Sequence, residues 1–501
     1  MYALVNARPW GVEADTIVIN SSGIIEKVGW EHSLTSMLAG VKRVDVGGAT
    51  VLPALHESHA HVFVEGKCGI DLRGIRSVGE LRNRIASFIA RHHPPYVVGR
   101  GWDHESFVER RMPRAEDLDQ AAGPVPTLII RVCGHVAVAN TALLKLAHSS
   151  NILDKLRDYL EFEDGRPTGV VVEDGVSMLR NLLPRPSREE AVEEVIGLLR
   201  TYRDYGVLYL NFMSVTSETL TMLKEAIQHV EGVNVATYVG LEDARRHPTL
   251  QEDELVVGVK VFADGSLGGR TAYLREKYSD FDTKGKLLMS SRLLEEVWRL
   301  SRGMGLKLAI HAIGDGALEE VIKFAKRVKP GRTVRVEHAS LTPPDIVGGL
   351  SNTVKDVVVQ PHFLVGDWWA ESRLGSRVRW LYAFKTLTDS GLTLYGSSDY
   401  PVEPLNPYLG ISCACTRGML QYVTRMEALN LEDAVRMYLH DPSFGDTSIR
   451  IGCRANLVVL NHDLSSIAPY DVAAARPKLV VASGRMIKVR DNFPGKLPGL
   501  Q

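Results

Sequence analysis

Residues 51–62 read VLPALHESHAHV, and this stretch decides the fold. Its first half is apolar and predicts a buried strand, and it closes on His59 and His61. In a strand, side chains two positions apart point to the same face, so we expect the two imidazoles to lie together. At the C-terminal end of a barrel strand, such a pair suits a borderline cation such as Zn²⁺. The alternative is two histidines that happen to end a strand, because His-x-His is a short and common string.

The composition of the 501-residue chain is that of a soluble globular protein, with 45% hydrophobic and 24% charged residues. The 59 basic side chains nearly balance the 60 acidic ones, and the net charge is -1. This balance gives no electrostatic basis for binding nucleic acid or a membrane surface. No apolar run is long enough to span a membrane, and the N-terminal residues lack the pattern of a secretion signal. We therefore expect a cytoplasmic protein.

The five cysteines are scattered along the chain, at Cys68, Cys133, Cys413, Cys415 and Cys453. Only Cys413 and Cys415 are close in sequence, and no second pair exists to complete a zinc knuckle. We therefore interpret the cysteines as buried thiols in a reducing cytoplasm.

Both ends of the chain have the pattern of short strands separated by turns. Residues 2–50 alternate apolar runs with Gly, Ser and Pro, and residues 456–489 repeat this pattern in NLVVLNHD and KLVVASGRMIKV. Neither end alone has enough strands to close a sheet over a sizeable core. We therefore predict one small β-sandwich domain formed by residues 1–50 and 445–501, with a barrel domain of residues 51–444 between them.

The middle of the chain alternates strands with amphipathic helices, which is typical of a parallel α/β fold. The candidate strands are residues 51–62, 206–213, 233–240, 256–265, 306–315, 333–340, 356–363 and 392–401. Eight such strands predict a closed (β/α)₈ TIM-type barrel, with its chemistry at the C-terminal strand ends. The gap between the first two strands is too long for one crossover. Residues 63–190 are therefore predicted as a large insertion after barrel strand 1, a lid or specificity region.

Ionisable side chains recur at the predicted C-terminal ends of the barrel strands. The histidine pair is followed by Lys260 on the fourth strand, His311 on the fifth, His338 on the sixth and Asp399 on the eighth. A single histidine of this kind is more often a satisfied core residue than a ligand. Five strand ends that all carry such groups are hard to attribute to chance, and together they predict a metal centre.

Lys260 lies between Val259 and Val261, where an ammonium group is costly to bury. Burial lowers the pKa of the amine, and a neutral amine reacts with CO₂ to give a carbamate. The carbamate is an anion that can bridge two divalent cations. The alternative is an ammonium group that pairs with Asp264 or extends to water.

Eight motifs spread over nearly the whole chain allow a comparison with known families. They are HESHAHV (56–62), GWDHESF (101–107), RVCGHVAVANTALL (131–144), VKVFADGSLGGRTAYL (259–274), HAIGDGALEEVI (311–322), RVEHAS (335–340), VVVQPHF (357–363) and GSSDYPVEPLNP (396–407). On these motifs the sequence resembles the amidohydrolase superfamily, in particular its amidohydrolase-3 branch with the N-substituted formamide deformylase-like enzymes. The resemblance implies a (β/α)₈ barrel flanked by a β-sandwich built from both termini. It also implies hydrolysis of a C–N bond with one or two divalent metals.

The resemblance assigns the metal-ligand role to His59, His61, Lys260, His311, His338 and Asp399. The first two would hold the more buried metal, the other two histidines the second metal, and Lys260 would bridge both as a carbamate. Water bound to such a metal has a pKa lowered from about 15.7 towards 7, so a metal-bound hydroxide would attack the substrate. Asp399 would take the hydroxide proton and deliver it to the leaving nitrogen. The expected cofactor is Zn²⁺ or another divalent metal, two per chain.

Four further residues are predicted to contact the substrate: His135, Trp102, Arg270 and His362. Each has a structural alternative. His135 could cap a loop, Trp102 could belong to the core, and Arg270 could pair with a nearby acid. His362 could instead support the metal ligands from behind, as is expected for Gln360 and Glu337.

Three departures from the family pattern concern the neighbourhood of the predicted ligands. Glu57 stands where the pattern has Asp, His56 is an extra histidine beside it, and Asn211 ends the second strand where relatives often carry a histidine. None of these changes removes a predicted ligand, but they leave the substrate class open.

The sequence therefore predicts a hydrolase that acts on a non-peptide C–N bond of a small molecule. The alternatives are a mononuclear deaminase, an isomerase or decarboxylase on the same fold, and a non-catalytic scaffold. Deaminase-type relatives typically need one metal and no bridging lysine, so the state of Lys260 separates them. The expected partner is the small-molecule substrate, without nucleic acid or membrane. A homo-oligomer is compatible with the fold, although no interface is identifiable.

Overall fold

The structure, a computed structural model, describes residues 1–132, 134–420 and 424–489. Within these residues the chain divides into two compact units. The first consists of Met1–Val62 and the chain from Ile196 onward, and the second consists of Phe63–Val195. The domain boundaries drawn from the sequence, including the insertion of residues 63–190, remain a prediction.

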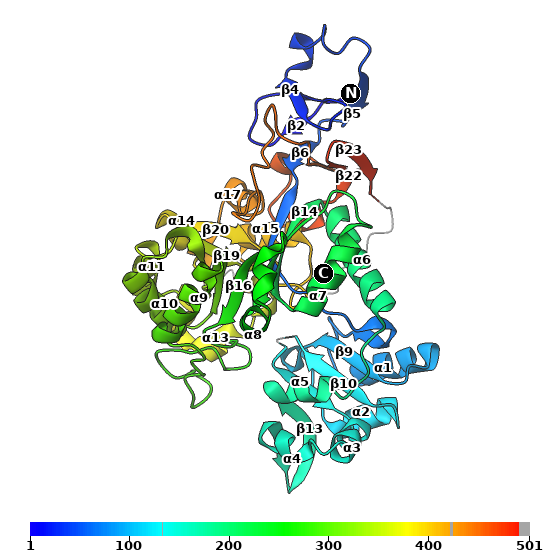
Figure 1. Cartoon of the computed structure of the whole chain (residues 1–501), viewed down its shortest axis with the longest axis vertical. Helices are drawn as coiled ribbons and strands as arrows, with labels where there is room; N and C mark the ends of the chain where they lie inside the picture. Colours follow the sequence, from blue (N-terminus) through cyan, green and yellow to red (C-terminus); the bar gives the residue numbers. More distant parts are fainter. Residues whose placement is uncertain (133, 421–423, 490–501) are drawn as a thin grey trace. The chain divides into compact units, whose positions relative to one another are not determined.

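Eight parallel strands of the first unit form a barrel (Figure 1). In order around the barrel they are β7 (Leu55–Ala60), β14 (Val207–Val215), β15 (Asn234–Gly240), β16 (Val256–Phe262), β17 (Lys307–Ala312), β18 (Val334–His338), β19 (Asp356–Val359) and β20 (Thr393–Gly396). The last strand returns to the first, because the amide of His61 donates to the carbonyl of Tyr400 (2.7 Å) and the amide of Asp399 to that of His59 (3.0 Å). This arrangement confirms the predicted (β/α)₈ barrel.

Helices follow most of the barrel strands, as the predicted alternation requires. They are α6 (Arg188–Asp204), α7 (Ser217–Ile227), α8 (Leu241–Arg246), α9 (Ser291–Gly303), α10 (Asp315–Val328), α11 (Pro344–Ser351), α12 (Phe363–Gly366), α13 (Ala370–Leu374), α14 (Phe384–Asp389), α15 (Pro407–Thr416) and α17 (Leu431–Arg436). Short polar side chains fix where several of them begin. Thr216 accepts a hydrogen bond from the amide of Thr219 before α7, and Asn406 accepts one from Tyr408 before α15.

The stretch at residues 51–62, predicted as one strand, contains two strands in different sheets. β6 (Thr50–Pro53) pairs with β2 (Arg8–Pro9) and β21 (Leu457–Leu460), whereas β7 pairs with β14. Only Ala54 separates them, and its amide donates to the carbonyl of Asn456 (2.8 Å). All residues of both strands are buried, so burial does not distinguish the two sheets.

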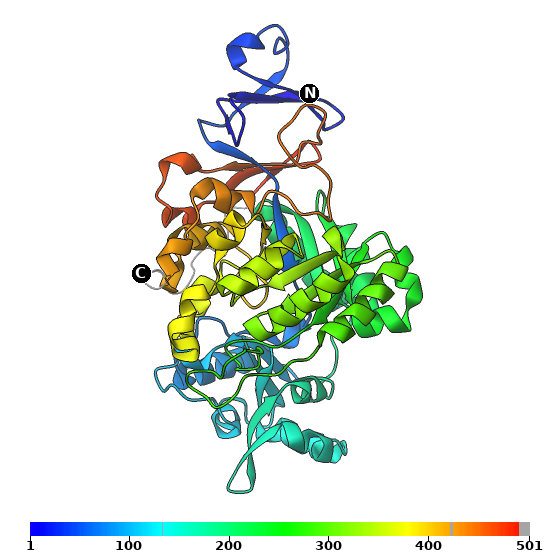
Figure 2. The ribbon, with the colours of Figure 1, turned by 90° about the vertical axis from the view of Figure 1, so that its left-hand side faces the viewer.

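The described N-terminal strands, in blue, and C-terminal strands, in red, lie side by side in both views (Figures 1 and 2). One sheet has the order β4 (Ile25–Gly29), β3 (Thr16–Ile19), β1 (Tyr2–Val5) and β5 (Lys42–Asp45). The other has the order β2, β6, β21, β22 (Pro477–Ala482) and β23 (Arg485–Lys488). Leu4, Ile17, Val51, Leu457 and Val481 belong to one apolar core shared by both sheets, which is the packing of a β-sandwich.

The second unit is built on a six-stranded sheet with a hydrophobic cluster on each face. Its strands, in sheet order, are β12 (Leu160–Glu163), β13 (Arg166–Val172), β11 (Val136–Ala139), β10 (Thr127–Arg131), β9 (Val97–Trp102) and β8 (Gly69–Asp71). Its helices are α1 (Val78–His92), α2 (Ala115–Ala122), α3 (Thr141–Ser149), α4 (Leu153–Leu156) and α5 (Asp174–Arg180). Leu128 and Ile130 of β10 lie in one cluster and Ile129 in the other, as the alternation of side chains along a strand requires.

In the described part of the chain, no helix is both long and apolar enough to cross a membrane. The four described cysteines are free thiols: Cys68 and Cys413 are buried, and Cys415 and Cys453 are partly buried. Cys133 lies outside the described residues.

Candidate metal centre

The predicted ligands come together at the C-terminal ends of the barrel strands. His59 lies near the end of β7, Lys260 on β16, His311 on β17 and His338 at the end of β18, and Asp399 follows β20. Parallel pairing produces this convergence. Phe262 lies opposite His311, and Ala312 lies opposite His338, so consecutive strands end at one level.

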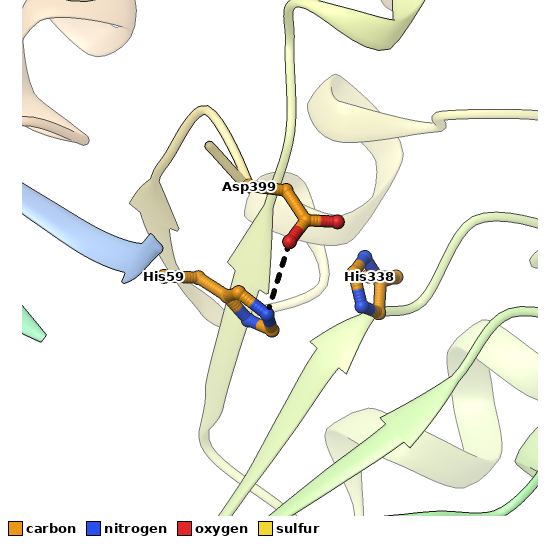
Figure 3. Close-up of side chains that lie close together, drawn as sticks. All are labelled: His59, His338 and Asp399. Carbon is orange, nitrogen blue, oxygen red and sulfur yellow. Dashed lines mark ion pairs between the residues drawn. The ribbon is translucent and has the colours of Figure 1, made fainter. Parts of the chain in front are cut away.

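Asp399 lies beside the histidine pair. Its Oδ1 atom is 3.3 Å from Nε2 of His59 and 3.2 Å from Nε2 of His61. One ligand atom from each of His59, His338 and Asp399 lies within 4.8 Å of the other two (Figure 3). His311 completes the cluster, because its ring centroid is 4.4 Å from that of His338.

Two of these residues have a backbone conformation that L-amino acids rarely adopt. His338 has φ 74° and Asp399 has φ 56°, both in the left-handed region. A non-glycine residue in this region costs roughly 1–3 kcal/mol and is usually held by the structure around it. The turn at each strand end therefore fixes where the side chain points.

Each of the four histidines has an acceptor behind it that fixes one ring proton. The contacts are His59 Nδ1 to Glu337 Oε2 (2.6 Å), His61 Nδ1 to the carbonyl of Met213 (3.2 Å), His338 Nδ1 to Gln360 Oε1 (2.8 Å) and His311 Nε2 to the carbonyl of Gly265 (2.9 Å). In a neutral imidazole, a proton on one nitrogen leaves the lone pair on the other. The contacts therefore select the tautomers that metal-binding histidines use.

The residues present fit a cation. Asp399 Oδ1 is buried and has no hydrogen-bond partner among the described residues. It faces Nε2 of His59 and His61, the nitrogens that carry the lone pairs in these tautomers. Burial lowers the pKa of both His59 and His338 well below the usual range, so both are neutral donors near pH 7. Converging lone pairs repel one another in a buried site, and a divalent cation removes that repulsion.

Lys260 is 1% exposed, and burial lowers the pKa of its amine to about 8. Its Nζ atom is 3.3 Å from Nε2 of His59 and 5.0 Å from the ring centre of Phe262. The carboxylate of Asp264, the alternative partner, accepts hydrogen bonds from backbone amides, for example those of Ile313 (3.0 Å) and Tyr273 (2.9 Å). The structure therefore agrees with the predicted direction of the lysine pKa.

Glu57, which departs from the family pattern, connects the first and last barrel strands. It accepts hydrogen bonds from the amide and hydroxyl of Ser398 and from the amide of His59. Burial raises the pKa of Glu57 to about 8. Because Ser398 precedes Asp399, Glu57 holds the turn that carries the predicted base. His56 points elsewhere, stacking on Tyr209 with ring centres 4.5 Å apart.

The four predicted substrate contacts are divided between the two units, Trp102 and His135 in the second and Arg270 and His362 in the first, and their role remains a prediction. Trp102 is fully buried in an apolar cluster of the second unit, which agrees with the core alternative. His135, also in the second unit, lies 3.0 Å from the carboxylate of Glu173. Arg270 forms an ion pair with Asp280 (2.8 Å). His362 is buried, with its ring nitrogens 2.8 and 3.2 Å from two backbone carbonyl oxygens.

Sequence reasoning missed two charged residues near the centre, Arg335 and Asp441. Arg335 contacts Glu337, the acceptor of His59, and Asp441 contacts Arg335. The signal was present in RVEH (335–338), where charged and apolar residues alternate on a strand that had to be buried.

Comparison with known proteins places the chain in one family. It is 26% identical over 517 residues to the putative amidohydrolase YtcJ of Bacillus subtilis, with 96% of each chain covered. It is 24% identical to the N-substituted formamide deformylase of Arthrobacter pascens, covering 92% of this chain and 93% of that one. The crystal structure of an uncharacterized metal-dependent hydrolase from Pyrococcus horikoshii superposes with a TM-score of 0.74 at 29% identity, covering 93% of this chain and 99% of the other.

With the His59–His338–Asp399 group, these relatives support a metal-dependent hydrolase that binds a divalent cation. The model of the amidohydrolase family matches residues 42–487. The resemblance to the amidohydrolase-3 branch is thereby confirmed, and the chain belongs to the amidohydrolase family.

Proposed function

We propose that the chain hydrolyses an amide-like, non-peptide C–N bond of a small molecule with the help of two divalent cations, Zn²⁺ or a similar metal. The observation that carries this proposal is a set of four histidines that each have one ring nitrogen held by an acceptor. Two of them, His59 and His61, direct Nε2 towards one buried carboxylate oxygen, Asp399 Oδ1. The cations would be held by His59, His61, Lys260, His311, His338 and Asp399. The substrate would be the principal partner, and the chain would act in the cytoplasm.

A bound divalent cation would act as a Lewis acid on the scissile carbonyl and would lower the pKa of water at the site. The chain itself supplies the proton transfer. Asp399 follows the last strand of the barrel, with its carboxylate among the imidazoles of His59, His61 and His338. There it would take a proton from the attacking water and deliver it to the leaving nitrogen, which is a poor leaving group without that proton.

We propose that Lys260 joins the centre as a carbamate. The neutral amine would form a nitrogen–carbon bond to CO₂, the electron pair of one C=O bond would move to oxygen, and the nitrogen would release a proton to solvent. The burial that lowers the pKa of Lys260 to about 8 supports this step, because it increases the neutral fraction of the amine near neutral pH.

One observation favours a second candidate, a mononuclear deaminase. The His59–His338–Asp399 group can hold one ion without Lys260. The state of the lysine therefore separates the two candidates.

The deciding experiment measures metal content per chain by elemental analysis, on protein purified without chelators and with bicarbonate present. We expect about two metal ions in the wild type and one or fewer in Lys260→Ala. Lys307→Ala is the matched control. Lys307 is another barrel-strand lysine, but its Nζ atom donates to the carbonyl of Pro442 (2.9 Å).

A content near two that falls only in Lys260→Ala supports the binuclear hydrolase, and formamides, N-acyl amines and cyclic amides are then the substrates to screen. About one metal ion per chain, unchanged in Lys260→Ala, contradicts the role of Lys260 as a ligand. Deaminase substrates are then screened first. Absence of metal after reconstitution contradicts both candidates.

A further inference from the structure

A row of three buried charged side chains and one imidazole leads from the last part of the barrel unit to the candidate metal centre. Its members are Asp441, Arg335, Glu337 and His59, and each contacts the next. Arg335 and Asp441 are both 3% exposed, and Glu337 and His59 are fully buried. Taking charges out of water is costly even when they are paired, so the fold maintains this row at a cost.

Arg335 holds both oxygens of the Glu337 carboxylate. Its Nε atom donates to Oε1 (2.6 Å) and its Nη2 atom to Oε2 (3.2 Å). The same Oε2 atom lies 2.6 Å from Nδ1 of His59. The planar guanidinium of Arg335 therefore fixes the plane of the Glu337 carboxylate. The lone pair of Oε2 that accepts the His59 Nδ1 proton is thereby fixed in direction.

Arg335 also contacts the backbone beside the ligand. Its Nη2 atom donates to the carbonyl of Ser58, the residue before His59. The remaining groups around the guanidinium hold it in place: Nη1 lies 3.2 Å from Asp441 Oδ2, and the guanidinium carbon lies 4.8 Å from the ring centre of Tyr238. Arg335 thus contacts both Glu337, which binds the His59 ring, and the backbone of β7, which carries His59.

We propose that Arg335 is a positioning residue of the metal centre, which, by clamping Glu337 and the Ser58 carbonyl, fixes the orientation and tautomer of His59 and so sets the affinity for a divalent cation. The inference rests on the proposed function in one respect, the role of His59 as a ligand.

Arg332 provides a matched control. It lies just before β18 and pairs with a buried carboxylate, Asp356 (2.6 Å). Asp356 also accepts a hydrogen bond from Tyr395 (2.9 Å), and none of these three residues contacts His59. Arg332→Met therefore removes an arginine–carboxylate pair just before the same strand without touching the row, although the Arg332 side chain is 59% exposed and that of Arg335 only 3%.

The test measures zinc affinity by competition with a chromophoric chelator in wild type, Arg335→Met, Arg335→Lys and Arg332→Met. Loss of a residue that orients a metal ligand typically costs about 10–100-fold in affinity, and we expect this loss in Arg335→Met. Arg335→Lys keeps the charge but not the two-point contact, so we expect an intermediate loss. Arg332→Met should stay within about twofold of wild type.

A second readout needs no metal. In zinc-free protein labelled with ¹⁵N-histidine, the Nδ1–H signal of His59, assigned by its absence in His59→Gln, should shift in Arg335→Met but not in Arg332→Met. Unchanged affinity and an unchanged signal in folded Arg335→Met would overturn the proposal, as would equal losses in the two Met variants.

Two further outcomes are also decisive. If Arg335→Met does not fold, Arg335→Lys decides, and wild-type values in that variant overturn the inference. If the wild type binds no zinc, the proposed metal centre fails, and the His59 signal alone decides whether Arg335 positions the ring.

Discussion

The terminal sandwich and the interior of the barrel solve the problem of burial in opposite ways. The sandwich core is aliphatic, with Leu457, Val459 and Val481 packed against strands from the N-terminus. The barrel interior buries Lys260 and Glu337 together with three histidines, His59, His311 and His338. Apolar burial stabilises a fold directly, whereas buried charges are costly unless each is paired. We infer that the sandwich core contributes to the free energy of unfolding. The barrel interior lowers it, because its buried polar and ionisable side chains replace apolar ones.

The two solutions lie one residue apart in sequence. β6 ends at Pro53 within the sandwich, and β7 begins at Leu55 within the barrel. The first strand reads TVLP and the second LHESHA, so the change from apolar to ionisable residues coincides with the change of sheet. Substitutions on the two sides of this joint should therefore separate activity from stability.

The largest expected effect comes from Asp399→Asn on the barrel side. We expect kcat to fall about 10³-fold, because the amide cannot accept and return a proton. Most of the metal should remain bound, since the histidines are unchanged. Steady-state kinetics with elemental analysis check both values. Asp356→Asn, which removes another buried carboxylate away from the centre, is the control, and full activity in Asp399→Asn would refute the proton-transfer role.

On the sandwich side, Leu457→Ala should reverse this pattern. Leu457 is 1% exposed on β21, and loss of such a side chain costs about 3 kcal/mol in the free energy of unfolding. Urea unfolding measures that loss. Metal content and kcat per folded molecule should match the wild type. A marked fall in kcat would show that the sandwich takes part in catalysis and that the comparison is too simple.

The smallest effect is expected at His56, on β7 beside the joint. Burial lowers the pKa of His56 to about 3, whereas the unfolded chain keeps the ordinary value near 6.5. The unfolded state therefore binds the proton more readily. The stability contributed by the neutral ring is fully present above pH 6.5 and is lost as the pH falls towards 3.

His56→Phe keeps the stacking on Tyr209 but cannot titrate. Between pH 7 and 5 the wild type should lose about 2 kcal/mol more stability than the variant. Urea midpoints across this range measure the difference. Parallel curves for the two proteins would contradict a buried neutral histidine.

The sequence predicted most of the barrel, because a parallel strand buried on both faces leaves a continuous apolar run. Residues 206–213, for example, were predicted as a strand, and β14 spans Val207–Val215. The change of sheet at Ala54 was not predictable, since both strands are buried and hydrophobicity does not identify the pairing partner.

The candidate site also has a part that the sequence predicted and a part that it did not. The six predicted ligands converge because parallel strands end together, although their binding of metal remains a prediction. Arg335 was missed because its partner Asp441 lies 106 residues further along the chain. Trp102 belongs to a motif, but a motif does not show whether its aromatic ring faces a pocket or the core.

The pairing of β6 with β21 has a consequence for biosynthesis. The ribosome makes β6 before β21, and roughly 400 residues lie between the two strands, which takes on the order of 20–80 s at typical translation rates. During that time one edge of β6 lacks its neighbour, and an unpaired strand edge invites association with other chains. A chaperone that covers this edge until β21 emerges would prevent such association.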